Sequence, residues 1–279
     1  MDLIFKLHLN NNSLMQGLNM NIRKALASTL LLTLAFSASA ADLLDTVKQR
    51  GTLKVALEGT YPPFNYKEGG QLAGFEVELA NALAQKLGVK AEFSTSEWSA
   101  ILAGLQAGKY DVVINQVGIT DKRKETFDFS EPYTISAPQL IIRKDEKREF
   151  KSLADLKGKK LGLGQGTNYA DIAKKVGGID VKTYPGAQEY LQDLALGRID
   201  AALNDSLLIP YIVKQTKLPL KPGAPVGDLE KSGIPFVKNN PKFKAALDKA
   251  LADLQADGSF AKISTKWFDR DVSKPPVAK

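Results

Sequence analysis

Residues 101–115, ILAGLQAGKYDVVIN, contain in order a leucine-rich segment, a glycine and a short β-branched run that ends in an asparagine. This order predicts a helix, a glycine turn and a buried strand of an α/β sheet. Residues 190–204, YLQDLALGRIDAALN, repeat the pattern, with leucines, the glycine, the aspartate and the last asparagine at equivalent positions. A unit that occurs twice indicates a chain built from two similar α/β lobes.

The first strands of the two lobes show a weaker match. Residues 53–60 (LKVALEGT) resemble residues 161–167 (LGLGQGT), because in both an apolar run leads to a Gly-Thr pair. Ligands of open α/β sheets bind outside the carboxyl ends of the strands. Two such lobes facing each other would therefore form a cleft lined by strand ends.

Polar residues follow the strand of the first lobe. Asn115, Gln116 and Gly118 lie where the apolar run stops, and Arg123 comes a few residues later. A guanidinium is a permanently charged fork of donors that matches a carboxylate. We expect Arg123 to anchor an acidic group of a small ligand. The alternative is a solvated arginine in the basic run of residues 122–124.

In the second lobe, Asp205 follows Asn204 and is the repeat counterpart of Gln116. A carboxylate at this point could pair with an ammonium group of the ligand. The alternative is a surface aspartate that caps a helix over residues 206–214. Thr167 and Asn168 open another helix, whose free N–H groups favour an anion; we interpret them as both cap and carboxylate site.

Aromatic residues lie near two of the strand ends. The loop of residues 58–64, EGTYPPF, carries Tyr61, which we expect to cover the apolar part of a ligand, whereas Phe64 is expected in the core. Trp98 lies in a polar connection before the helix predicted over residues 100–107. It is either an ordinary core tryptophan or a second aromatic wall of the cleft.

The remaining pattern completes the two lobes. Apolar residues at helical spacing predict further helices over residues 42–49, 75–87, 241–255 and 260–268. Residues 133–142 and 232–237 are expected to be extended. Residues 217–227, rich in proline and glycine, are expected to form a loop.

The first forty residues have the pattern of a secretory signal peptide. A basic start at Met20 is followed by the uncharged apolar run of residues 25–36 and the small residues 38–40. This run is too short for a membrane span. We expect the mature chain to begin at Ala41. Residues 1–19 would then be an upstream extension, unless the basic region is unusually long.

Composition excludes several kinds of chemistry. The 279 residues include no cysteine, and the only histidine, His8, lies within residues 1–40. Cysteine nucleophiles, Ser-His-Asp relays, and zinc sites of Cys or His are therefore excluded from the mature chain, as are disulfides and a lipid-anchoring cysteine. We expect no metal and no cofactor. The net charge of +7 comes from lysines interleaved with acids, which indicates a solvated surface and not a nucleic-acid site.

Two motifs resemble those of a known family. Residues 118–123 (GITDKR), followed by residues 127–133 (FDFSEPY), are similar to the signature of the periplasmic amino-acid-binding proteins of ABC importers, solute-binding protein family 3. The resemblance extends over residues 41–273. It is also carried by EGTYPPF (58–64), GFEVE (74–78), VVINQV (112–117) and GTNY (166–169).

The resemblance implies a type II periplasmic binding protein, in which two α/β lobes joined by two hinge strands close over one amino acid. Its parts would be a signal peptide (1–40), a first lobe (41–136), a second lobe (137–235) and the C-terminal part of the first lobe (236–279). Such a protein is not an enzyme. It is a periplasmic, non-lipidated monomer that delivers its ligand to an ABC transporter permease in the inner membrane.

The resemblance also implies which residues contact the ligand. Arg123 would clamp the α-carboxylate with the main chain near Gly118 and Thr167, and Asp205 would hold the α-ammonium. Two aromatic residues would flank the ligand, and four polar residues would shape the side-chain pocket. The implied set is Tyr61, Trp98, Asn115, Gln116, Gly118, Arg123, Thr167, Asn168, Tyr169 and Asp205. Many family members have a hydroxyl residue in place of Gly118, which puts the polar network around the ammonium in question.

The resemblance favours L-cystine as the ligand, with cysteine or another polar amino acid as alternatives. A different class of function is a dehydratase-like enzyme on the same scaffold, with a carboxylate such as Glu58 or Glu97 as the acid or base. A third is a sensor or adhesin that uses the fold for recognition.

Overall fold

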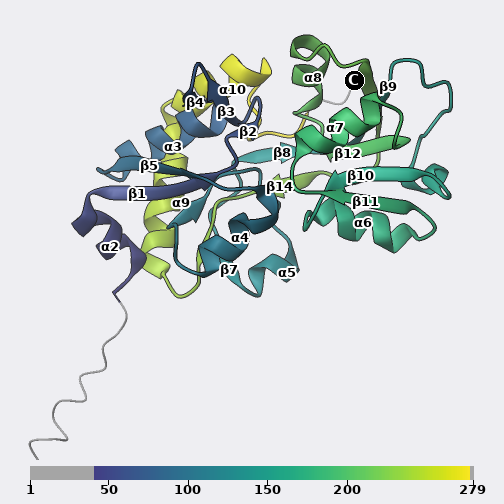
Figure 1. Cartoon of the computed structure of the whole chain (residues 1–279). Coiled ribbons are helices and arrows are strands. Elements are labelled where there is room, and N and C mark those ends of the chain that lie inside the picture. Colours follow the sequence, from purple (N-terminus) through teal and green to yellow (C-terminus); the bar gives the residue numbers. More distant parts are fainter. Residues whose placement is uncertain (1–40, 277–279) are drawn as a thin grey trace, which may run out of the picture. The chain divides into compact units, whose positions relative to one another are not determined.

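The computed structural model describes residues 41–276, and the predicted signal peptide lies outside these residues (Figure 1). Within this part of the chain, no helix has both the length and the apolar character needed to cross a membrane. The described residues form two lobes, each with its own β-sheet.

The sheet of the first lobe has three parallel strands in the order β5-β1-β6. These strands are β1 (Thr52–Leu57), β5 (Lys90–Thr95) and β6 (Val112–Val113). The helices along this part of the chain are α2 (Leu43–Arg50), α3 (Phe75–Lys86), α4 (Trp98–Gln106) and the short α5 (Asp121–Lys124). A small antiparallel sheet follows β1 and consists of β2 (Thr60–Tyr61), β3 (Asn65–Glu68) and β4 (Gln71–Ala73).

The sheet of the second lobe has five strands in the order β11-β10-β12-β9-β13. They are β9 (Pro138–Arg143), β10 (Lys160–Gly164), β11 (Asp180–Tyr184), β12 (Ala201–Asp205) and β13 (Leu220–Pro225). The helices are η1 (Leu153–Leu156), α6 (Asn168–Val176), α7 (Ala187–Ala195) and α8 (Ile209–Gln215).

The internal repeat predicted from the sequence is present in the structure. The parallel strands β5-β1-β6 and β11-β10-β12 have the same order, and α4 with β6 corresponds to α7 with β12 (Figure 1). The repeated aspartates have the same function in both lobes. Asp111 accepts a hydrogen bond from Lys54 N of β1 at 2.7 Å, and Asp200 accepts one from Lys160 N of β10 at 2.9 Å.

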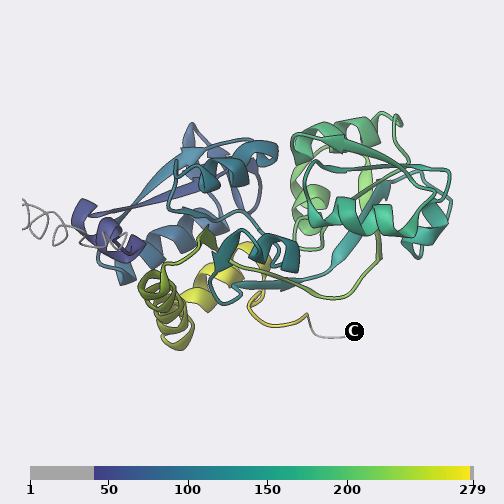
Figure 2. The ribbon, with the colours of Figure 1, turned by 90° about the horizontal axis from the view of Figure 1, so that it is seen from below.

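One antiparallel pair of short strands lies where the chain passes between the lobes, and a second pair lies beside β6 and α4 of the first lobe (Figure 2). β8 (Thr134–Ser136) pairs with β14 (Glu230–Ser232), and β7 (Phe127–Phe129) pairs with β15 (Pro235–Val237). The outgoing and returning segments thus lie side by side, as expected of hinge strands. The boundaries of the lobes in the sequence stay a prediction.

The C-terminal helices return to the first lobe. α9 (Pro241–Ala256) contacts α3 and α2, and α10 (Ser259–Phe268) contacts α3. Their aromatic residues enter the first lobe's core, since Phe75 packs edge-to-face on Phe260 and Phe268 at centroid distances of 5.9 and 5.1 Å. Phe64 is fully buried beside them, as predicted.

Three predictions of secondary structure were wrong: one strand was missed and two helices begin at other residues. The loop expected over residues 217–227 contains β13, an edge strand with an irregular register between Pro222 and Pro225. Proline is tolerated there because the outer side of an edge strand needs no N–H donor. α4 begins at Trp98 and not at residue 100. α8 begins at Ile209 and not at residue 206, after a turn.

Candidate functional site

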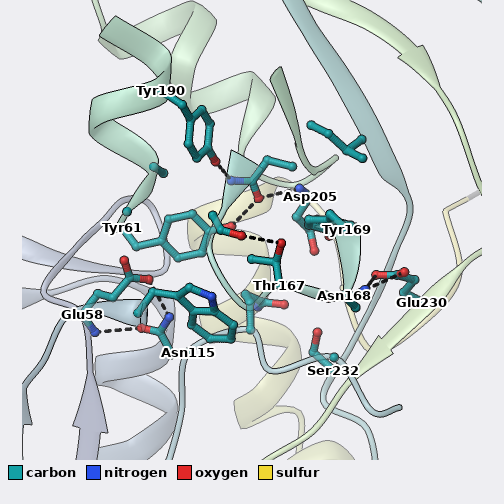
Figure 3. Close-up of a pocket in the computed structure, with 18 residues that line it drawn as sticks. Glu58, Tyr61, Asn115, Thr167, Asn168, Tyr169, Tyr190, Asp205, Glu230 and Ser232 are labelled. Atoms are coloured by element: carbon teal, nitrogen blue, oxygen red, sulfur yellow. Dashed lines mark hydrogen bonds between the residues drawn. The ribbon is translucent and has the colours of Figure 1, made fainter. Parts of the chain in front are cut away.

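A cavity lies where strand ends and helix starts of both lobes meet (Figure 3). Nine of the ten predicted ligand-contacting residues line it: Tyr61, Trp98, Asn115, Gln116, Gly118, Thr167, Asn168, Tyr169 and Asp205. The tenth, Arg123, lies beside the cavity and hydrogen-bonds the main chain of Gly118. The repeat therefore brings the predicted residues together, although they are far apart in sequence.

Arg123 is held between the lobes. Its Nη1 donates to Gly118 O at 2.8 Å, and its Nη2 donates to Gly166 O of the second lobe at 3.2 Å. Its guanidinium lies over the Trp98 ring, 5.4 Å from the centroid, in a cation–π contact. Burial lowers the pKa of the guanidinium, which still stays charged. These bonds use two of its five N–H donors.

The alternative of a solvated Arg123 is wrong. The flanking side chains of Lys122 and Lys124 are 80% and 56% exposed, whereas Arg123 is half-buried. Thr120 caps α5 and accepts a hydrogen bond from Arg123 N, which turns the arginine toward the cavity.

Asp205 ends β12 and is 3% exposed. Its Oδ1 accepts from Leu207 N at 2.8 Å, and its Oδ2 accepts from Ser136 Oγ at 2.6 Å. Burial raises the pKa of this carboxyl to about 6, although both hydrogen bonds act in the opposite direction. The alternative of a surface aspartate is wrong, because the side chain is buried and α8 begins only at Ile209.

Asn115 fixes the loop that follows β1. Its Oδ1 accepts from Glu58 N at 2.8 Å and from Asn65 Nδ2 at 2.9 Å, and its Nδ2 donates to Glu58 Oε2 at 2.7 Å. Glu58 is thereby placed in the wall of the cavity. Burial raises the pKa of Glu58 to about 7, partly offset by the bond from Asn115.

Gln116 adopts a left-handed backbone conformation, with φ of 47°. Its N–H donates to Glu76 Oε1 at 2.7 Å and to Tyr133 Oη at 3.0 Å. Its Oε1 accepts from Thr134 Oγ1 at 2.8 Å, but its Nε2 is buried and has no hydrogen-bond partner within residues 41–276. An unpaired buried donor costs about 1–3 kcal/mol, so this amide can be satisfied by an acceptor on a ligand.

The start of α6 supplies three predicted residues. Thr167 is the N-cap, since its Oγ1 accepts from Ala170 N at 3.3 Å. Asn168 begins the helix and donates its Nδ2 to both carboxylate oxygens of Glu230 at 2.7 Å (Figure 3). Tyr169 follows, and burial followed by the charge of Asp205 raises the pKa of its hydroxyl.

The aromatic walls differ in their anchoring. Tyr61 is 7% exposed and donates its hydroxyl to Asn204 Oδ1 of the second lobe at 2.7 Å. Its ring stacks on Phe64 at a centroid distance of 4.9 Å. Trp98 is half-buried in the first turn of α4, where it lines the cavity and also packs against the core cluster that contains Ile101.

Gly118 leaves a small space between polar groups. A Cβ at this position would meet Arg123 Nη1 and Asn168 Oδ1, each at 3.4 Å, which is an ordinary contact. Its main chain pairs with Ser232 in an isolated bridge. Gly118 has no side chain, so the hydroxyl that other family members are expected to have at this position is absent.

Sequence reasoning missed several cavity residues. Asn204 had a signal, because it is the repeat counterpart of Asn115, and Glu58 was considered only as a possible acid or base. Tyr190 and Glu230 carried no signal in the sequence. Glu230 belongs to the returning hinge strand β14, whose place beside the cavity depends on the tertiary fold.

The cavity is acidic. The charged residues that line it are Glu58, Asp205 and Glu230, and the cation Arg123 lies beside it. The described residues contain no cluster of three or more His, Cys, Asp or Glu side chains suited to a metal ion. Carboxylates and a guanidinium around aromatic walls can hold a small molecule that carries both an ammonium and a carboxylate group.

Comparison with known proteins gives consistent results. A family model for bacterial extracellular solute-binding proteins, family 3, matches residues 53–270. The chain is 46% identical over 234 residues to the L-cystine-binding protein TcyJ of Escherichia coli (strain K12), a match that covers 83% of this chain and 88% of the relative.

Solved structures show the same similarity. An ancestral arginine-binding protein bound to arginine has a TM-score of 0.74 and 39% identity, covering 78% of this chain and 99% of that chain. The ancestral amino acid-binding protein AncCDT-1, a precursor of cyclohexadienyl dehydratase, has a TM-score of 0.75 and 34% identity, covering 81% of this chain and 99% of that chain.

The residues matched by the family model include strands of both sheets and every residue that lines the cavity. These matches agree with the two-lobed α/β architecture and with the position of the cavity at the strand ends. The chain therefore belongs to the bacterial extracellular solute-binding proteins, family 3.

Proposed function

We propose that this protein is the periplasmic substrate-binding component of an ABC importer. It binds one polar amino acid between its two lobes and delivers it to a permease in the inner membrane. It acts as a monomer and catalyses no reaction. Family membership and the transport-associated relatives support this proposal.

The observation that carries the proposal is the opposition of Arg123 and Asp205 around one cavity. Arg123 comes from the first lobe and Asp205 from the second. An amino acid that pairs with both would contact the two lobes at once. Such a ligand favours the closed arrangement, because a hinge closes only when the ligand binds the closed state better.

The other predicted residues complete the site. The N–H groups at the start of α6, with Thr167 as cap, add donors for the carboxylate that Arg123 holds. Tyr61 and Trp98 flank the ligand body. Gln116 offers its unpaired Nε2 to an acceptor on the ligand.

We infer that L-cystine is the ligand. The support is the 46% identity to a protein named as an L-cystine-binding protein. The cavity is consistent with this, because it combines aromatic walls with polar groups from both lobes that suit a molecule with two polar ends. Cysteine and other polar amino acids are the alternatives, and one similar structure holds arginine.

Calorimetric titration tests the proposal. The protein is expressed with its own leader, purified from the periplasm, and unfolded and refolded to remove carried-over ligand. It is then titrated with cystine, cysteine, arginine and other amino acids. We expect tight one-to-one binding of cystine that is lost in Arg123→Ala and retained in Lys124→Ala, a matched control whose side chain is 56% exposed and pairs with Asp121 of the same helix.

The alternative results are distinct. Preference for another amino acid would keep the importer and reject cystine. Absence of binding to every amino acid would reject the proposal. N-terminal sequencing of the same preparation tests the predicted cleavage before Ala41.

A dehydratase-like activity is a second candidate, because one similar structure is a precursor of cyclohexadienyl dehydratase. Glu58 lines the cavity, and burial raises its pKa to about 7, which suits a general acid at neutral pH. Glu97, the other carboxylate considered, is exposed and does not line the cavity. Release of a dehydrated product from a prephenate-like acid, lost in Glu58→Gln, would support the enzyme; saturable binding without product would reject it.

A further inference from the structure

Glu230 is the cavity carboxylate that no predicted role explains. It lies on the returning hinge strand β14, lines the cavity and is half-buried. Both of its oxygens accept from one atom, Asn168 Nδ2, at 2.7 Å (Figure 3). Burial raises the pKa of Glu230, and the negative charge of Asp205 raises it further.

Glu230 and Asp205 are linked through the paired hinge strands. Glu230 lies opposite Ser136 in the β14–β8 register, and Ser136 Oγ donates to Asp205 Oδ2 at 2.6 Å. Two carboxylates are therefore placed close to one end of the cavity. Like charges in such a pair disfavour ionisation of both, and a cation placed near them relieves the repulsion.

The two carboxylates differ in how many protein donors they already have. Asp205 has a separate donor for each oxygen and is almost fully buried. Glu230 has one amide group shared between its oxygens, whereas an ionised carboxylate can accept about four hydrogen bonds. Glu230 therefore keeps acceptor capacity that a ligand ammonium can use.

Three carboxylates line the cavity and the cation Arg123 lies beside it, so a ligand that brings further positive charge is favoured. Arg123 lies beside the cavity and lowers the pKa of Glu230, but it is bonded to two main-chain carbonyls and no ion pair joins it to Glu230. A ligand side chain that ends in a carboxylate alone would face Glu58, Asp205 and Glu230 and be repelled, whereas the second carboxylate of cystine is accompanied by an ammonium group on the same carbon. Such repulsion is a means of rejecting wrong ligands.

We propose that Glu230 is a specificity-determining residue of the cleft, which accepts a hydrogen bond from a ligand ammonium and excludes amino acids with acidic side chains. This inference rests on the proposed amino-acid-binding function. It adds a selection by charge: ligands whose side chain carries a cationic group, such as cystine, lysine and arginine, are preferred over glutamate and aspartate.

The test compares ligands of different charge on one pair of variants. Glu230→Gln keeps the shape and the bond to Asn168 but removes the charge. Asp228→Asn removes a charge two residues earlier, where the side chain is exposed, and is the matched control. Each protein is refolded free of ligand and titrated calorimetrically with cystine, lysine, arginine, glutamate and aspartate.

We expect Glu230→Gln to weaken binding of the preferred ammonium-rich ligand roughly ten- to a hundredfold, as for loss of a charge-assisted hydrogen bond. The affinity for glutamate should stay equal or increase. The ratio of the affinity for the preferred ligand to the affinity for glutamate should therefore decrease. Asp228→Asn should leave the ratio unchanged. Thermal melting without ligand verifies folding, and Glu230→Asp, which restores the charge, should recover part of the ratio.

If Glu230→Gln leaves the ratio of these two affinities unchanged while the wild-type protein binds its amino acid, this inference is overturned and the proposed function stays intact. Equal weakening of all ligands would do the same, because it would reduce Glu230 to a structural partner of Asn168. Wild-type protein that binds no amino acid would reject both proposals.

Discussion

The two strand ends at the cavity differ although the strands that carry them repeat. β6 leads to Asn115 and Gln116, and β12 ends in Asn204 and Asp205. Both asparagines are buried and use their amides to hold neighbouring segments. The residues after them diverge, since Gln116 presents an unpaired N–H donor and Asp205 a buried carboxylate. The repeat thus keeps the framework and varies the position that faces the cavity.

The strand ends are also anchored differently. In the first lobe, the N–H of Gln116 is held by the carboxylate of Glu76, which is fully buried. In the second lobe, the N–H of Asp205 donates to its neighbour Asn204 at 2.6 Å. A buried carboxylate therefore supports one side of the cleft, and an amide supports the other. The two sides should respond differently to mutation and to pH.

The largest effect is expected from changes at the divergent position itself. Asp205→Asn should weaken binding of the amino acid by about 2–5 kcal/mol, because it removes the buried partner of an ammonium. Gln116→Leu should cost only about 0.5–1.5 kcal/mol, the value of a neutral hydrogen bond. Calorimetric titration of both variants measures the difference. Equal losses would mean that the two strand ends contribute alike.

Asp205→Asn should also stabilise the ligand-free protein above pH 6. Burial raises the pKa of Asp205 to about 6, so ionisation of this group costs free energy in the folded state. Urea unfolding at pH 7.5 measures this second effect. A variant that is less stable than wild type would indicate that the bonds from Ser136 and Leu207 outweigh the burial of the charge.

The repeated asparagines offer a matched pair for stability. Asn115→Ala leaves the N–H of Glu58 without its acceptor and the amide of Asn65 with only Glu76 as acceptor. Asn204→Ala leaves the hydroxyl of Tyr61 and the N–H of Asp205 without their acceptor. Each should lower the free energy of unfolding by about 2–4 kcal/mol, since each unpaired buried group costs 1–3 kcal/mol. Urea denaturation measures both losses.

Asn81→Ala is the control for this pair. Asn81 is exposed on α3, and its amide donates to Val77 O within the same helix. Its replacement should change stability by less than about 0.5 kcal/mol. Losses at Asn115 and Asn204 that match this small value would show that the buried amides do not hold the strand ends.

The repeated framework was the part of the fold that the sequence revealed best. A helix, glycine turn and strand with matching leucines predicted that α4 with β6 would correspond to α7 with β12, because buried periodicity is a local signal. β13 was missed for the opposite reason. Its prolines and glycine indicate a loop locally, and only its position at the sheet edge makes a strand possible.

The same distinction applies to the candidate site. Polar residues directly after predicted strands, such as Gln116 and Asp205, were found because a strand end is visible in sequence. Glu230 was not, because it reaches the cavity from a strand that crosses back between the lobes. The pairing of Asn168 with Glu230 likewise joins residues 62 positions apart, for which no pattern in a single sequence exists.

The buried carboxylate of the first lobe predicts a pH dependence of stability. Burial raises the pKa of Glu76 from 4.5 to about 7, although bonds from Tyr133, Asn65 and Gln116 lower it. The folded state therefore binds this proton more tightly than the unfolded state. The contribution of Glu76 to the free energy of unfolding is therefore greatest below pH 4.5. It is lost as the pH rises through 7, by about 3 kcal/mol in total.

Urea unfolding between pH 4.5 and 7.5 measures this dependence. Glu76→Gln should flatten the decline, and Glu58 and Asp205, whose pKa values burial raises to about 7 and about 6, should account for what remains. Glu78→Gln, a partly exposed neighbour on α3, is the control and should leave the slope unchanged. The same slope in wild type and Glu76→Gln would contradict this role for Glu76.

The smallest difference is expected between the repeated aspartates, which bind equivalent N–H groups in different surroundings. Asp111 is 6% exposed, and its Oδ2 accepts from Lys54 N and from Arg50. Asp200 is half-buried and accepts from Lys160 N and from Arg148. Water can replace the acceptor at Asp200 more easily than at Asp111.

Asp111→Ala should therefore lower the free energy of unfolding by about 2–3 kcal/mol, the cost of a buried N–H left unpaired, and Asp200→Ala by about 1 kcal/mol. Urea denaturation at neutral pH resolves a difference of this size. Addition of 1 M salt should reduce the loss at Asp200 more than at Asp111, because exposed ion pairs are screened and buried ones are not. A larger loss at Asp200 would mean that its ion pair with Arg148, and not the bond to the strand, holds this corner of the second lobe together.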